Sequence, residues 1–101
     1  MAEITGGELL VRCLHAEGVR YVHAITDGTY MMVLEALERL GKEFGIQLIV
    51  PRHEAAAAHA CDAYTRCAGE PAVVMACAGP GAANLIAGLM CAEQRAARLS
   101  P

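Results

Sequence analysis

Short apolar runs alternate with amphipathic stretches along the chain. The runs are rich in β-branched residues, which is typical of strands, and they lie at residues 19–25, 46–50 and 72–77. Elsewhere apolar side chains recur at helical spacing, as in Val33, Leu37 and Leu40. We expect helices that end at Gly18 and at Gly41, and further helices over residues 53–67 and from 82 to about 92.

One helix followed by three strand–helix units predicts a parallel sheet with right-handed crossovers. The third run, residues 72–77, is apolar on both faces, as expected of a central strand. With 101 residues there is room for one domain. We therefore expect a three-layer α/β fold of the flavodoxin-like kind, with helices on both faces of the sheet. Thr5 and Glu8 fit a capping box at the start of the first helix, in which the Glu8 side chain reaches back.

Charge and cysteine content narrow the classes of function. The net charge of −3 gives no electrostatic case for nucleic acid or an anionic membrane, and no apolar run has the length of a membrane span. The five cysteines are odd in number and form no Cys-x-x-Cys pair, so we expect buried thiols in a reducing cytoplasm. We expect no metal ligands within this chain.

Three turns follow the three predicted strands. They are Thr26-Asp27-Gly28, Arg52-His53-Glu54 and Gly79-Pro80-Gly81. Because parallel strands end at the same edge of a sheet, these turns should line one crevice, with helix N-termini aimed into it. Each signal is weak alone, since Gly-Pro-Gly is often only a tight turn and Thr-Asp-Gly a turn and helix cap.

Glu54 is the candidate for chemistry at this edge. It follows an apolar strand and opens a helix that begins with four alanines. Desolvation by these neighbours would raise its pKa and suit it to proton transfer. The plain alternative is that an acidic residue at a helix N-terminus complements the helix dipole.

The stretches at residues 52–60, 64–69 and 76–85 carry Arg-His-Glu followed by alanines and, later, Gly-Pro-Gly-Ala-Ala-Asn-Leu. Together they resemble the pyrimidine-binding domain of thiamine-diphosphate enzymes, most of all the acetolactate synthase large subunit and relatives such as benzoylformate decarboxylase. The resemblance covers residues 3 to about 92. Two stretches depart from it: Thr26-Asp27-Gly28 replaces the Pro-Gly-Gly of acetolactate synthases, and Cys77-Ala78 replaces Thr-Ser.

The resemblance implies a catalytic role for Glu54. In the family this glutamate hydrogen-bonds N1′ of the cofactor's aminopyrimidine and favours the 4′-imino tautomer, whose nitrogen removes the C2 proton. His53 precedes the glutamate as in the family, and its plain alternative is a helix cap. The remaining residues implied to contact the cofactor are Pro80, Gly81 and Asn84, which flank the pyrimidine, and Thr26, Asp27 and Gly28, which face the thiazolium and substrate.

The same resemblance implies partners. The family holds Mg²⁺ and the diphosphate with a Gly-Asp-Gly stretch that this sequence lacks, and the FAD-carrying middle domain of acetolactate synthases is missing too. We therefore expect an incomplete pyrimidine-binding domain at residues 1–92 and a divergent tail at 93–101. By itself such a chain would be inactive on 2-oxoacids. It would need a diphosphate-binding domain or subunit in trans, and it would form homo-oligomers. The alternatives are the small subunit of a split 2-oxoacid decarboxylase and a non-catalytic interaction module.

Overall fold

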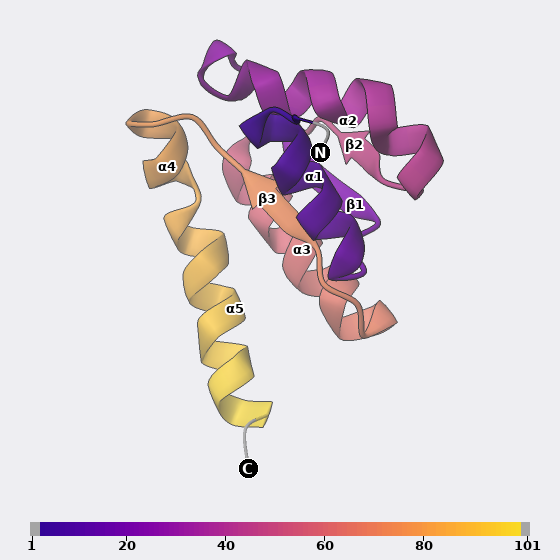
Figure 1. The fold of residues 1–101 in the computed structure, drawn as a ribbon. Helices are drawn as coiled ribbons and strands as arrows, with labels where there is room; N and C mark the ends of the chain where they lie inside the picture. Colours follow the sequence, from indigo (N-terminus) through magenta and orange to yellow (C-terminus); the bar gives the residue numbers. More distant parts are fainter. Residues whose placement is uncertain (1–2, 100–101) are drawn as a thin grey trace.

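The computed structural model describes residues 3–99, and side chains through residue 94. Helices and strands alternate as the sequence predicts (Figure 1). The elements are α1 (Gly6–Ala16), β1 (Tyr21–Ala24), the 3₁₀ helix η1 (Gly28–Tyr30), α2 (Met31–Phe44), β2 (Gln47–Ile49), α3 (Glu54–Ala68), β3 (Val73–Met75), α4 (Pro80–Asn84) and α5 (Ile86–Leu99). No helix in this described part is both long and apolar enough to cross a membrane.

The three strands form one parallel sheet in the order β2-β1-β3. Val22 of β1 lies opposite Leu48 of β2 and Val73 of β3. The predicted α/β class and parallel sheet are confirmed. The predicted central position of the third strand is wrong within the described residues, because β1 holds the centre and β3 pairs on one side only. The burial of the strands fits a central β1, since Val22, His23 and Ala24 are buried while β3 is half-buried.

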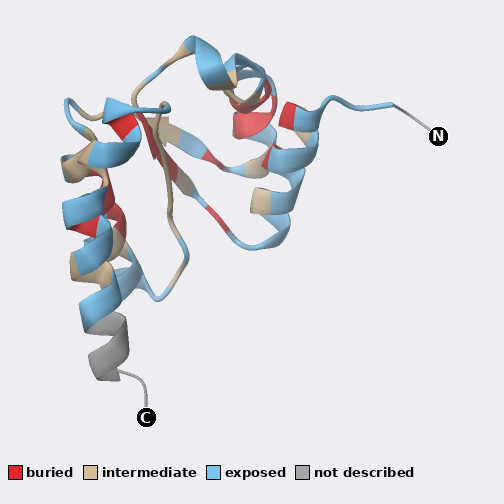
Figure 2. Cartoon of the chain, turned by 90° about the vertical axis from the view of Figure 1, so that its left-hand side faces the viewer, coloured by how far each residue is buried: buried red, intermediate tan, exposed pale blue. Residues whose placement is uncertain are grey.

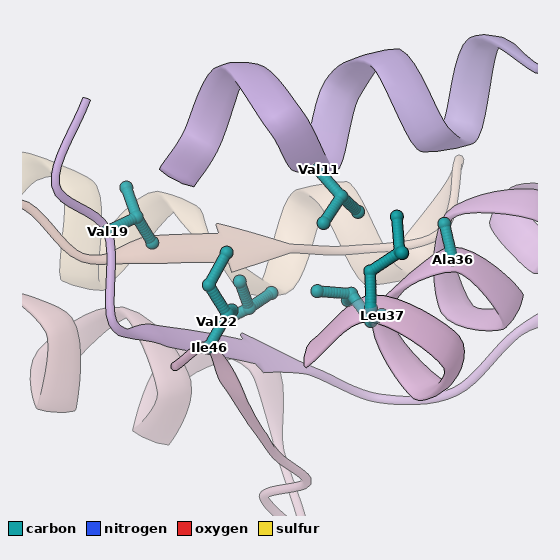
Figure 3. Close-up of a cluster of buried hydrophobic side chains, with 7 residues drawn as sticks. Val11, Val19, Val22, Ala36, Leu37 and Ile46 are labelled. Carbon is teal, nitrogen blue, oxygen red and sulfur yellow. The ribbon is translucent and has the colours of Figure 1, made fainter. Parts of the chain in front are cut away.

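Helices cover both faces of the sheet. On one face α1 and α2 pack over β1, where Val11, Val22 and Leu37 meet in the main apolar core (Figure 3). Because side chains alternate along a strand, the neighbouring His23 points to the opposite face, where it contacts Cys61 of α3. Figure 2 shows the buried residues on the inner surfaces of the layers, and α5 running beside α3.

The ends of two predicted helices require correction. Gly41 does not end α2, which continues to Phe44 and is capped by Gly45 at φ 68°. Gly41 is instead a close-packing position, since a Cβ there would lie 2.7 Å from the carbonyl oxygen of Ile46. The predicted helix from residue 82 is two helices, α4 and α5, and α5 runs without a break through residue 92.

The start of α1 is capped by Thr5, whose Oγ1 accepts the backbone N–H of Glu8 at 3.1 Å. The predicted return bond from Glu8 is replaced by ion pairs. The Glu8 carboxylate binds Arg12 at 2.9 Å and Arg39 of α2 at 3.1 Å, so it joins the two helices on this face of the sheet.

Candidate functional site

The parallel topology brings three turns to the carboxyl edge of the sheet. They lead from β1 into η1, from β2 into α3 and from β3 into α4. Each therefore precedes a helix start, where backbone N–H groups lack helical partners and favour anionic or acceptor groups. The edge predicted from the sequence exists, and the side chains at these turns make up the candidate site.

Glu54 and Asn84 meet at this edge, although 30 residues separate them. The Asn84 amide Nδ2 donates to Glu54 Oε2 at 3.0 Å. Gly81 lies against the other carboxylate oxygen, because a Cβ added to it would stand 3.4 Å from Glu54 Oε1 and 3.4 Å from the Cβ of Cys77. A carboxylate, an amide and a bare backbone position thus share one corner of the site.

The pKa of Glu54 differs in direction from the sequence-based expectation. It is lowered, first by the backbone N–H at the start of α3, then by the Asn84 amide and by nearby His53. Burial acts in the opposite direction but does not dominate, and the side chain is only half-buried. In the chain alone Glu54 is therefore an ionised carboxylate at neutral pH.

His53 forms the cap of α3. Its Nδ1 accepts the backbone N–H of Ala55 at 3.0 Å, and its extended backbone, with φ −153° and ψ 145°, is typical of an N-cap residue. The structure therefore confirms the alternative that His53 caps the helix, through its Nδ1 atom. The exposed ring also fixes the point at which Glu54 enters the helix.

Asp27 occupies the turn after β1, where it caps η1. Its Oδ1 accepts the backbone N–H of Thr29 at 2.7 Å and the Thr29 hydroxyl at 2.5 Å. Thr29 Oγ1 also lies 3.5 Å from the sulfur of Cys77, which follows β3. These bonds lower the pKa of Asp27, chiefly through the Thr29 hydroxyl. The turns after β1 and β3 are thereby joined by side chains.

The other predicted residues sit at the edge in different ways. Gly28 opens η1 and Pro80 opens α4, and both are exposed. Thr26 lines a separate cavity of about 430 Å³ between α2 and β2, together with residues such as Leu34 and Lys42. Among the described residues, Glu54 is thus hydrogen-bonded to Asn84 and lies beside Gly81, but no hydrogen bond joins it to Thr26, Gly28 or Pro80.

Sequence reasoning missed Thr29 and Tyr30. The Tyr30 hydroxyl donates a short hydrogen bond to the carbonyl oxygen of Ile25 and so closes the turn after β1. The pKa of Tyr30 is raised first by burial and then by electrostatic interaction with Asp27, Cys77 and Glu54, so all three lie near this phenol. The available signal was the polar cluster Thr-Asp-Gly-Thr-Tyr directly after a strand.

Comparison with known proteins identifies a family for this chain. Residues 4–99 match the family model described as thiamine pyrophosphate enzyme, N-terminal TPP binding domain. The acetolactate synthase large subunit of Haemophilus influenzae is 39% identical over 92 residues, or 91% of this chain and 16% of that protein. The acetolactate synthase of Bacillus subtilis is 42% identical over 88 residues, or 87% of this chain and 15% of that protein. A chloroplastic acetolactate synthase of Arabidopsis thaliana is 38% identical over 84 residues, or 83% and 12% respectively.

The chain spans only 12% to 16% of the length of these relatives. The match nevertheless takes in nearly all of the chain, including the strand ends, the α3 start and the α4 turn that carry the candidate site. The resemblance seen in the sequence is therefore confirmed: this chain belongs to the family of the N-terminal TPP binding domain of thiamine pyrophosphate enzymes.

Proposed function

We propose that this chain supplies the pyrimidine-binding half of a thiamine diphosphate site in an acetolactate-synthase-like enzyme that acts on 2-oxoacids, with Glu54 as the proton-handling residue. The observation that carries the proposal is the hydrogen bond from Asn84 to Glu54, beside Gly81, at the carboxyl edge of the sheet. Ligands of open α/β sheets bind at this edge.

The residues at this corner fit an aminopyrimidine ring. Gly81 adds no side chain beside the carboxylate, where a Cβ would stand 3.4 Å from Glu54 Oε1. The Asn84 amide engages Oε2 and so leaves Oε1 as the oxygen that meets a ring nitrogen. Carboxylate and amide groups can pair with the nitrogen atoms of such a ring through directional hydrogen bonds.

Glu54 would hold a proton at the ring nitrogen N1′. Its pKa in the chain alone is lowered, so it first acts as an acceptor. A ring placed against Oε1 would exclude water, and this desolvation raises the pKa of a carboxyl group toward the range in which a proton is shared. When bound, thiamine diphosphate supplies an electron sink at the 2-oxo carbon of the substrate.

The neighbouring residues would shape the rest of this half-site. His53 fixes the start of α3 and hence the position of Glu54. Pro80, at the first position of α4, sets the backbone beside Gly81. The turn of Thr26, Asp27 and Gly28 would face the thiazolium and the substrate.

The remainder of the site would come from outside this chain. A diphosphate-binding domain or subunit would hold the diphosphate with Mg²⁺, and FAD would belong to a further domain. Exposed apolar side chains support such docking: Ile86, Leu89 and Met90 recur at helical spacing on α5 and are 54%, 49% and 54% exposed. We propose that these side chains help the chain to assemble into homo-oligomers. We also propose that the chain lies in the cytoplasm and does not turn over 2-oxoacids alone.

The test is binding of thiamine diphosphate to the 101-residue chain, followed by amide chemical shifts in NMR. With the diphosphate half absent, the expected affinity is weak, about 1 mM or about −4 kcal/mol. Signals of Glu54, Gly81 and Asn84 should shift, and Glu54→Gln should abolish these shifts. Glu43→Gln, an exposed glutamate on α2, is the matched control and should bind like the parent chain. Equal shifts in the Glu54→Gln chain, or shifts that cluster away from this edge, would disprove the proposed role.

A further inference from the structure

Thr29 stands between the two turns that flank Glu54, and neither the family resemblance nor the comparisons give it a role. It belongs to η1, after β1, and its hydroxyl lies 2.5 Å from Asp27 Oδ1 and 3.5 Å from the sulfur of Cys77, which follows β3. Its backbone N–H adds a second bond to Asp27 Oδ1 at 2.7 Å. One short side chain therefore touches a carboxylate from one strand end and a thiol from the next.

We propose that Thr29 is a positioning residue that fixes the Asp27 carboxylate between the turns after β1 and β3, so that Asp27 meets a bound ligand as a held hydrogen-bond acceptor. Because both Thr29 bonds go to Oδ1, Oδ2 is the oxygen through which Asp27 accepts a bond from the ligand. The inference rests on the proposed function, since it assigns Thr29 to the same site.

The groups around Asp27 and Thr29 favour a fixed, ionised Asp27 carboxylate. The Cys77 thiol adds hydrogen bonding to the set, and all three contributions lower the pKa of Asp27. Tyr30 closes the same turn through its bond to the Ile25 carbonyl, and its pKa is raised in part by Asp27, Cys77 and Glu54. Among the described residues, the groups that lower the pKa of Asp27 are the Thr29 hydroxyl, the Thr29 backbone N–H and the Cys77 side chain.

The chemistry follows from this arrangement. A carboxylate held by charge-assisted hydrogen bonds to an N–H and an O–H keeps its charge at neutral pH and loses rotational freedom. Such a group favours a ligand that brings a hydrogen-bond donor or positive charge to this end of the site. Valine at position 29 would keep the shape and the backbone bond but remove the hydroxyl, which carries the largest lowering of the Asp27 pKa.

The experiment uses the full 101-residue chain and needs no second domain. The titration of the Asp27 carboxyl carbon is followed by NMR in the parent chain and in Thr29→Val, Thr29→Ser and Tyr30→Phe. We expect the Asp27 midpoint to rise toward the ordinary aspartate value in Thr29→Val. It should return to the parent value in Thr29→Ser, which restores a hydroxyl, and stay unchanged in Tyr30→Phe, which loses only the turn-closing bond.

An unchanged midpoint in Thr29→Val, or an equal rise in Tyr30→Phe, would overturn the proposal, because the turn as a whole would then hold Asp27. If Thr29→Val does not fold, the same titration in the parent chain tests the contact. The chemical shift of the Thr29 amide proton should change with the midpoint of Asp27, and an amide shift that stays constant through this titration would refute the contact.

A ligand readout separates this inference from the proposed function. Thiamine diphosphate at about 10 mM, above the expected dissociation constant of about 1 mM, should shift the Asp27 carboxyl signal in the parent chain and in Thr29→Ser, and shift it less in Thr29→Val. Absence of any shift at Glu54 on adding thiamine diphosphate would count against the proposed function, whereas the pH titration of Asp27 would still decide the role of Thr29.

Discussion

Gly88 offers the sharpest test of how α5 packs on α3. It is buried, and a Cβ at this position would lie 2.3 Å from the Cβ of Ala58. The backbone of Ala58 and His59 stands 3.3 Å away, so no flexible side chain can yield. Gly88→Ala must therefore push α5 outward until the two Cβ atoms reach ordinary contact, at 3.4 Å or more.

The cost of this displacement can be estimated. Overpacking of this kind costs about 1–3 kcal/mol. Alanine in place of glycine returns about 1 kcal/mol through helix propensity. We therefore expect Gly88→Ala to lower the free energy of unfolding by about 1 kcal/mol, which shifts the melting temperature of a domain of this size by roughly 4–8 °C. Gly6→Ala is the matched control, because nothing lies within 4 Å of its added Cβ.

Urea unfolding followed by circular dichroism measures these differences, and a double-mutant cycle isolates the contact. Ala58→Gly removes the clashing Cβ, so in that background Gly88→Ala should stabilise the chain by about 1 kcal/mol through helix propensity, with a coupling energy of about 1–3 kcal/mol. Gly88→Ala as stable as Gly6→Ala, or no coupling between positions 58 and 88, would refute the close approach of the two helices.

Further predictions concern buried groups on the α3 side of the sheet. Burial lowers the pKa of His23 from its ordinary value of 6.5, so its stabilising contribution is complete above that pH and is lost as pH falls through the lower folded-state pKa. Urea unfolding at about pH 7.5 and about pH 5 should show a larger loss of stability in the parent chain than in His23→Gln, and equal losses would contradict this. Burial also raises the pKa of the Cys61 thiol to about 11, so iodoacetamide should label Cys61 far more slowly than the exposed Cys67 in the native chain, as read by mass spectrometry. Equal labelling rates in native buffer would mean that α3 does not cover Cys61.

The sequence was sufficient to predict the parts of the site that depend on chain order. The strand–helix alternation gives a parallel sheet, a parallel sheet gives one edge for three turns, and Glu54 between an apolar run and an alanine run gives a helix start. These features need only local pattern and the handedness of crossovers.

Features that depend on contacts between distant segments could not be predicted from the sequence. Gly41 resembles a helix stop, but it is small because Ile46 passes 2.7 Å from where its Cβ would be. The pKa of Glu54 was expected to rise by desolvation, but the α3 backbone and the Asn84 amide outweigh burial. Strand order depends on which strands pair, and the apolar character of the third run does not determine this pairing. The sequence pattern therefore could not predict that β1 is central.

The central claim is that Glu54 handles the proton at the pyrimidine of thiamine diphosphate. Its most direct test grafts residues 4–99, the segment matched by the family, in place of the corresponding segment of the Haemophilus influenzae acetolactate synthase large subunit. NMR then follows proton–deuterium exchange at C2 of the bound cofactor. We predict that Glu54→Gln slows this exchange by about 10²-fold or more, the typical size of a general acid–base contribution, while Glu43→Gln leaves it unchanged. Exchange in the Glu54→Gln chimera as fast as in its parent would contradict the claim and leave Glu54 as a carboxylate that only complements the N-terminus of α3.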